Sequence, residues 1–183
     1  MSAPTLAQHA HAQAGSPAPA VVRCADLEAQ SLEGFVRRFG MQLHRVADGA
    51  AIPGSYWCDD EAGLVGHTLY VRADTPVHSL LHELCHWLCM DPGRRAVLHT
   101  NAGGEDVEEH AVCYLQCLLA DGVPGYARQR CFADMDAWGY TFRLGSAGAW
   151  FERDAEDARR WLEERGLLAR DARKGLGTPE RAR

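Results

Sequence analysis

The sequence contains no long apolar run and no strongly basic block ahead of its C-terminus. No stretch reaches the roughly 18 consecutive apolar residues of a transmembrane helix, and the N-terminus lacks the charged and apolar regions of a signal peptide. The net charge is −6. A chain of this charge has no general affinity for nucleic acid or an anionic membrane. We therefore expect no nucleic-acid partner and no membrane partner.

The cysteines lack the patterns of a disulfide framework or a zinc ribbon. There are 7 of them, an odd number, and no two form a C-x-x-C pair. A reducing compartment fits this usage best, so we expect a cytoplasmic protein. Cys85 and Cys89 are four residues apart, as are Cys113 and Cys117. On helices each pair would share one face, where thiols usually act as small buried apolar groups.

Charge is also missing from residues 1–20, which are rich in Ala, Pro, Gln and Ser and contain no Asp, Glu, Lys or Arg. Such a segment has little with which to build a core, so a disordered tail is predicted. Residues 170–183 are basic and contain Gly and Pro, and we expect a second flexible tail there. Residues 21–169 remain as a single domain, a size sufficient for a hydrophobic core.

Apolar periodicity within residues 21–169 predicts an α+β fold that is mainly helical, with a short antiparallel or mixed sheet before the central helix. A glycine-containing loop over 93–104 is expected at the rim of a cleft. The predicted strands are Met41–Val46 and Leu64–Val71, and the predicted helices are Asp26–Phe39, Pro76–Met90, Glu105–Ala120, Tyr126–Trp138 and Trp150–Leu168.

The sequence His82-Glu83-Leu84-Cys85-His86 matches the pattern H-E-x-x-H. In a helix of about 3.6 residues per turn, the two histidines lie one above the other and can bind one metal ion. Glu83 then lies beside the open coordination position, where it can accept a proton from a bound water. We expect one Zn²⁺ ion, because zinc favours nitrogen and carboxylate ligands in a tetrahedral site.

The surroundings of this motif favour a metal site over a chance match in a histidine-containing amphipathic helix. The flanking residues are apolar, as a buried helix requires. Thr75 can cap the helix and Pro76 suits its first position. The sequence Asp91-Pro92-Gly93 ends it about four turns later.

The helix predicted over Glu105–Ala120 offers a third metal ligand. Counting from Glu108, positions 111, 112, 115 and 119 are apolar, so Glu108 lies on an inward-facing stripe. A buried carboxylate needs a partner, and a metal ion is one. Glu108 is therefore the preferred ligand, followed by Glu109 and then by His110 and Glu105. Glu109 shares a less apolar face with Val112, Cys113 and Gln116.

With these two helices in place, the chain resembles the zincin metallopeptidases whose third ligand is a Glu. Residues 108–119 resemble the second helix of compact ImmA/IrrE-type peptidases, in which a Glu three residues before an Ala is followed by an aromatic residue and paired leucines. Those positions are filled here by Glu108, Ala111, Tyr114, Leu118 and Leu119. The resemblance covers residues 64–124. It implies a zincin-like fold, one zinc ion held by His82, His86 and Glu108, and cleavage or regulation of a protein partner.

The leading hypothesis is thus a zinc metallopeptidase acting on a peptide or protein, with Glu83 as its general base. A further donor to the developing oxyanion is expected, and the candidates are Tyr114, Tyr140, His99 and His110. The competing hypothesis is a non-catalytic zincin-like protein that binds metal for regulation or interaction. Such a site would be closed by a fourth protein ligand, such as His110 or a cysteine.

Overall fold

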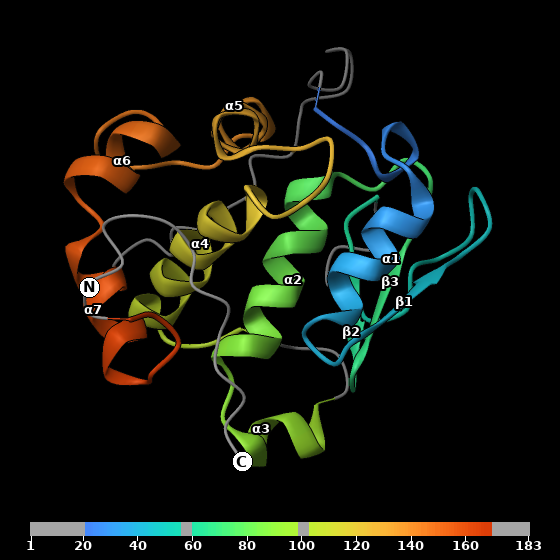
Figure 1. Cartoon of the computed structure of the whole chain (residues 1–183), viewed down its shortest axis with the longest axis horizontal. Coiled ribbons are helices and arrows are strands. Elements are labelled where there is room, and N and C mark those ends of the chain that lie inside the picture. Colours follow the sequence, from blue (N-terminus) through green and yellow to red (C-terminus); the bar gives the residue numbers. More distant parts are fainter. Residues whose placement is uncertain (1–20, 56–59, 99–102, 170–183) are drawn as a thin grey trace.

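The computed structural model describes residues 21–55, 60–98 and 103–169 (Figure 1). The two predicted tails, 1–20 and 170–183, lie outside the described residues. The elements follow the order η1 (Cys24–Asp26), α1 (Ala29–Arg37), β1 (Gln42–Arg45), β2 (Gly63–Val65), β3 (Thr68–Val71), α2 (Val77–Cys89), α3 (Pro92–Val97), α4 (Asp106–Ala120), α5 (Arg128–Trp138), α6 (Ala147–Arg153) and α7 (Glu156–Glu164). The α+β prediction is confirmed.

The sheet has three strands in the order β1-β3-β2. β1 pairs with β3 in parallel and β2 pairs with β3 antiparallel, so the sheet is mixed, as expected. The prediction of one continuous strand over Leu64–Val71 was wrong. The chain reverses at Gly66, which has a φ of 56°, and the segment folds into the hairpin β2–β3. Glycine adopts this conformation at little cost because it has no Cβ.

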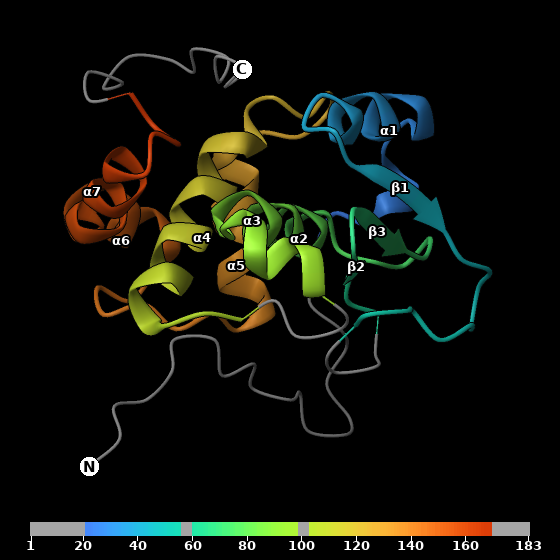
Figure 2. The same ribbon diagram turned by 90° about the horizontal axis from the view of Figure 1, so that it is seen from below.

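α2 is the central element of the fold. It packs between the sheet on one side and α4 on the other, and both views show this arrangement (Figures 1 and 2). Leu80, Leu81, Leu84 and Cys85 on α2 are fully buried. The expected cap at Thr75 was one residue off, because Pro76 is the N-cap and the Thr75 hydroxyl accepts a hydrogen bond from Arg72 N (2.9 Å). Neighbours on both sides explain why this helix is apolar around most of its circumference.

Two predictions, one for a loop and one for a helix, were wrong. The loop expected over 93–104 begins with α3, because Asp91 caps a new helix by accepting hydrogen bonds from Gly93 N (2.8 Å) and Arg94 N (3.1 Å). The helix expected over Trp150–Leu168 is divided into α6 and α7, since Asp154 and Ala155 leave helical geometry. The predictions over Asp26–Phe39, Glu105–Ala120 and Tyr126–Trp138 were confirmed as α1, α4 and α5, with shifts of up to three residues at their ends.

The six cysteines among the described residues are buried and free. Burial raises the pKa of Cys89 to about 12 and that of Cys85 well above its usual value. These thiols stay protonated and behave as the small apolar groups that the sequence predicts. In the part of the chain that the structure describes, no helix has the length and apolar character to cross a membrane.

Asp134 on α5 ties the first described segment to the helices. It is 1% exposed, and its carboxylate accepts hydrogen bonds from Val22 N (3.1 Å), Tyr126 Oη (2.9 Å) and Arg130 Nε (2.6 Å). This buried carboxylate is stable because Arg130 compensates its negative charge and the three donors satisfy its oxygen lone pairs.

We expect Asp134→Ala to lower the free energy of unfolding by about 2–4 kcal/mol, because it leaves buried donors without an acceptor. Urea denaturation measures the change. Asp48→Ala, in an exposed turn, is the control and should change stability by less than about 0.5 kcal/mol. Equal stabilities of the two variants would show that the Asp134 contacts contribute no net stability.

Candidate metal centre

His82 and His86 lie one turn apart on the buried face of α2. They are 8% and 4% exposed, and their Nε2 atoms are 3.0 Å apart. Burial and the neighbouring His82 and Arg94 lower the pKa of His86 well below its usual value, so its imidazole is neutral. A neutral imidazole has the lone pair that metal ligation requires. The predicted pairing of these two histidines on one helical face is therefore present in the structure.

Gln116 on α4 fixes the tautomer of His82. The Gln116 amide nitrogen donates to the carbonyl oxygen of His78 (2.9 Å), which orients the amide and places its oxygen 3.1 Å from His82 Nδ1. Because an amide oxygen only accepts, Nδ1 carries the proton and the lone pair is on Nε2. An outer hydrogen bond of this kind orients many metal-ligating histidines. For His86 Nδ1, no hydrogen-bond partner is found among the described residues.

Glu109 on α4 directs a carboxylate oxygen at both histidines. Its Oε2 lies 3.8 Å from His82 Nε2 and 3.7 Å from His86 Nε2. Its other oxygen, Oε1, accepts a hydrogen bond from Gly104 N (3.2 Å). Ligand atoms of His82, His86 and Glu109 all lie within 4.8 Å of one another, so this buried group could hold a metal ion.

The preference for Glu108 as third ligand does not match this geometry. Arg94 Nη1 lies 2.7 Å from both carboxylate oxygens of Glu108, so an arginine compensates this charge. Gly104 makes room for the pair, because a Cβ at this position would lie 2.4 Å from the Glu108 carboxyl carbon. Glu109, the second choice from the sequence, lies with the histidines instead.

The other predicted ligands on this helix are also elsewhere. Glu105 is the exposed N-cap of α4, and the His110 ring lies 6.2 Å from the ring of Trp150. The sequence signal that points to Glu109 is Gln116. It lies seven residues, about two turns, from Glu109 and so on the same face. A polar residue in the middle of an apolar helix marks the face that meets His82.

Glu83 lies beside the two histidines in the chain and is partly buried. Burial and the nearby carboxylates of Glu61 and Glu109 raise its pKa to about 8. A cation in the site would favour the charged form of Glu83 and lower this pKa. Perturbed carboxyl groups of this kind are frequent at functional sites.

Among the predicted oxyanion donors, Tyr140 lies close to the histidines, with its ring centroid 6.1 Å from that of His82. Burial raises the Tyr140 pKa well above its usual value, so its hydroxyl remains a donor. Tyr114 instead stacks on Phe151 with ring centroids 4.4 Å apart. His99 lies outside the described residues.

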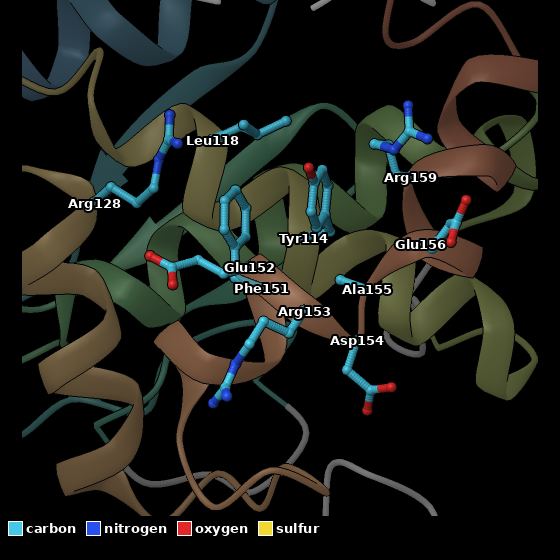
Figure 3. A pocket seen from close by; sticks show the side chains of 10 residues that line it. All are labelled: Tyr114, Leu118, Arg128, Phe151, Glu152, Arg153, Asp154, Ala155, Glu156 and Arg159. Carbon is cyan, nitrogen blue, oxygen red and sulfur yellow. The ribbon is translucent and has the colours of Figure 1, made fainter. Parts of the chain in front are cut away.

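A cavity of about 490 Å³ lies elsewhere, between α4, α6 and α7. Figure 3 shows the rings of Tyr114 and Phe151 side by side, with Arg128 and Arg159 to either side of them. At about 100° per residue, Tyr114 and Leu118 face away from the side of α4 that carries Glu109. The residues that line the cavity include none of the three candidate metal ligands, so it is not part of this site.

No protein-family model, curated protein or solved structure matches this chain. The assignment of the site therefore rests on its own chemistry. Two imidazole nitrogens and one carboxylate oxygen meet at one buried point, and this donor set suits a divalent transition metal. A closely spaced set of lone pairs and a negative charge is stabilised by a shared cation.

We expect Glu109→Gln to lower metal affinity by at least about 100-fold, because it removes the charged ligand. Glu108→Gln is the matched control and should stay within about threefold of wild type, since it changes an ion pair with Arg94. Competition with a chromogenic chelator measures both affinities. A larger loss in Glu108→Gln than in Glu109→Gln would restore Glu108 as the ligand.

We further expect Gln116→Met to weaken metal binding by about 10–100-fold, because His82 loses the acceptor that fixes its tautomer. The same competition assay applies, with circular dichroism to check folding. The control Gln42→Met, at an exposed position on β1, should leave affinity unchanged. Unchanged affinity in Gln116→Met would show that His82 needs no outer hydrogen bond.

Proposed function

We propose that this protein is a zinc-dependent metallopeptidase that hydrolyses a peptide bond. The observation that carries the proposal is the meeting of His82, His86 and Glu109 at one buried point, with Glu83 adjacent in sequence to the first of them. A peptide or protein is the proposed substrate.

Zinc is the proposed metal because its usual protein ligands are the ones found here. Imidazole nitrogen and carboxylate oxygen bind it at about 2.0–2.2 Å, and two histidines with one glutamate form a frequent catalytic set. When bound in such a site, zinc polarises a carbonyl group and lowers the pKa of water to about 7.

The proposed roles of the protein groups follow from their protonation. Glu83 in its charged form accepts a proton from the attacking water and then passes it to the leaving amine. Gln116 keeps the His82 proton on Nδ1, away from the ligand nitrogen. Tyr140 is the proposed donor to the developing oxyanion, because its ring lies 6.1 Å from that of His82 and its hydroxyl stays protonated.

The number of ligands favours an enzyme over a closed regulatory site. A structural zinc site usually has four protein ligands, whereas a catalytic one keeps a position open. Within the described residues, the only group of three or more metal ligands contains His82, His86 and Glu109 and no fourth member. His110, the fourth ligand considered from the sequence, lies against Trp150 instead.

We expect Glu83→Gln to keep zinc and to lose hydrolysis of peptides by about 10²–10⁴-fold in kcat/KM, because only the proton acceptor is removed. Zinc content by mass spectrometry and cleavage of a broad peptide library measure the two properties. Loss of zinc from Glu83→Gln would make Glu83 a ligand. Zinc binding by wild type without any cleavage would favour the regulatory alternative.

A further inference from the structure

The cavity between α4, α6 and α7 has an aromatic and apolar wall. The rings of Tyr114 and Phe151 are stacked, with their centroids 4.4 Å apart and their planes at 12°. Leu118 follows Tyr114 by about one turn of α4 and lines the same cavity. Its volume of about 490 Å³ lies within the range of about 300–1,000 Å³ that is usual for small-molecule sites. The wall therefore suits the flat or apolar part of a small ligand.

One end of this cavity carries hydrogen-bond donors. Figure 3 shows the Tyr114 hydroxyl at the end where the guanidinium groups of Arg128 and Arg159 lie. Burial raises the Tyr114 pKa, and the positive charges of Arg159 and Arg128 oppose that rise, so both lie near the phenol. The hydroxyl thus stays protonated at neutral pH. Among the described residues, no hydrogen bond of this hydroxyl is found, so it can donate to a ligand.

Both arginines are held by carboxylates and still have N–H groups to spare. Arg128 Nη2 donates to Asp121 Oδ2 (2.5 Å), and its guanidinium lies 5.1 Å from the centroid of the Phe151 ring. Arg128 Nε is buried without an acceptor in the part of the chain that the structure describes. Arg159 pairs with Glu163 through Nη1. Because a guanidinium has five N–H groups and each side chain is 28% exposed, both can also donate to a ligand.

Three carboxylates also line the cavity, but they compete little for these donors. Asp154 forms an ion pair with Arg143, and Figure 3 shows its carboxylate at the opposite end from the Tyr114 hydroxyl. Glu152 and Glu156 are exposed, so the solvent screens their charge. The end of the cavity near the Tyr114 hydroxyl is therefore the one that suits an anionic group.

We propose that this cavity binds a small organic anion, whose carboxylate or phosphate group is held by Tyr114, Arg128 and Arg159. The aromatic or apolar part of the ligand lies against the stacked rings. A guanidinium matches both anionic groups, because it can donate two parallel hydrogen bonds to either. The site is separate from the candidate metal centre, and binding there does not depend on peptidase activity.

The probes share one ring system and differ in charge: naphthoate, naphthyl phosphate and the neutral naphthamide. Isothermal titration calorimetry measures their affinities for wild type, Tyr114→Phe, Arg159→Gln and the control Arg160→Gln. Arg160 is the next residue on α7, is exposed and does not line the cavity. Tyr114→Phe keeps the stacked ring, and circular dichroism checks that every variant is folded. Each titration is run with and without zinc, because a carboxylate can also bind zinc.

We expect wild type and Arg160→Gln to bind naphthoate or naphthyl phosphate at least about tenfold more tightly than naphthamide, with or without zinc. Tyr114→Phe and Arg159→Gln should each weaken binding of the preferred anion by about tenfold, because each removes a donor to a charged group. Their affinity for naphthamide should equal that of wild type. The anion that binds more tightly identifies the ligand as a carboxylate or a phosphate.

Equal affinities of wild type for the charged probes and naphthamide would overturn the inference, as would no binding of any probe. An equal loss in Arg160→Gln would also contradict it, because that result would show a general effect of positive charge on α7. The same holds for an anion affinity that Tyr114→Phe and Arg159→Gln leave unchanged. Anion binding that requires zinc would assign the anion to the metal centre and not to this cavity.

Discussion

Two imidazoles and a carboxylate meet in the interior of this protein, and the packing of α2 against α4 is arranged around them. Burying such groups is costly unless each has a partner. His82 has Gln116 on one ring nitrogen, and Glu109 has the Gly104 amide on one oxygen. The Nε2 atoms of His82 and His86 and the Oε2 atom of Glu109 face one another across less than 4 Å. A divalent cation bound there would satisfy all three at once.

The neighbouring carboxylate shows a different solution to the same problem. Glu108 is as buried as Glu109, yet Arg94 from α3 neutralises it. α3 is in turn attached to the end of α2, where Arg95 Nε donates to the carbonyl oxygen of Trp87 (2.8 Å) and Nη2 to that of Leu88 (3.0 Å). The short helix thus stabilises the last turn of α2 and keeps one of two adjacent acids away from the histidines. One short helix, α3, thus provides both the hydrogen bonds at the end of α2 and the arginine that pairs with Glu108.

The features that depend on local periodicity could be predicted from the sequence alone. The spacing of His82 and His86 determines their shared face, and acidic residues with Gly122 and Pro124 define the ends of α4. The sequence did not predict features that depend on a contact with a residue far away in the chain. Burial alone could not separate Glu108 from Glu109, because their difference comes from Arg94 and Gln116. In the same way, the β-branched content of residues 64–71 does not reveal that Gly66 reverses the chain.

The buried cysteines have a consequence for how the opening of this core can be observed. Cys85 and Cys113 lie on α2 and α4, the two helices that supply the candidate metal ligands, and both are protonated and shielded from solvent. A thiol reagent reaches them only when these helices separate. The rate of their labelling therefore reports the free energy of local opening without any engineered cysteine. Comparing that rate with and without bound metal measures how far the ion holds the two helices together.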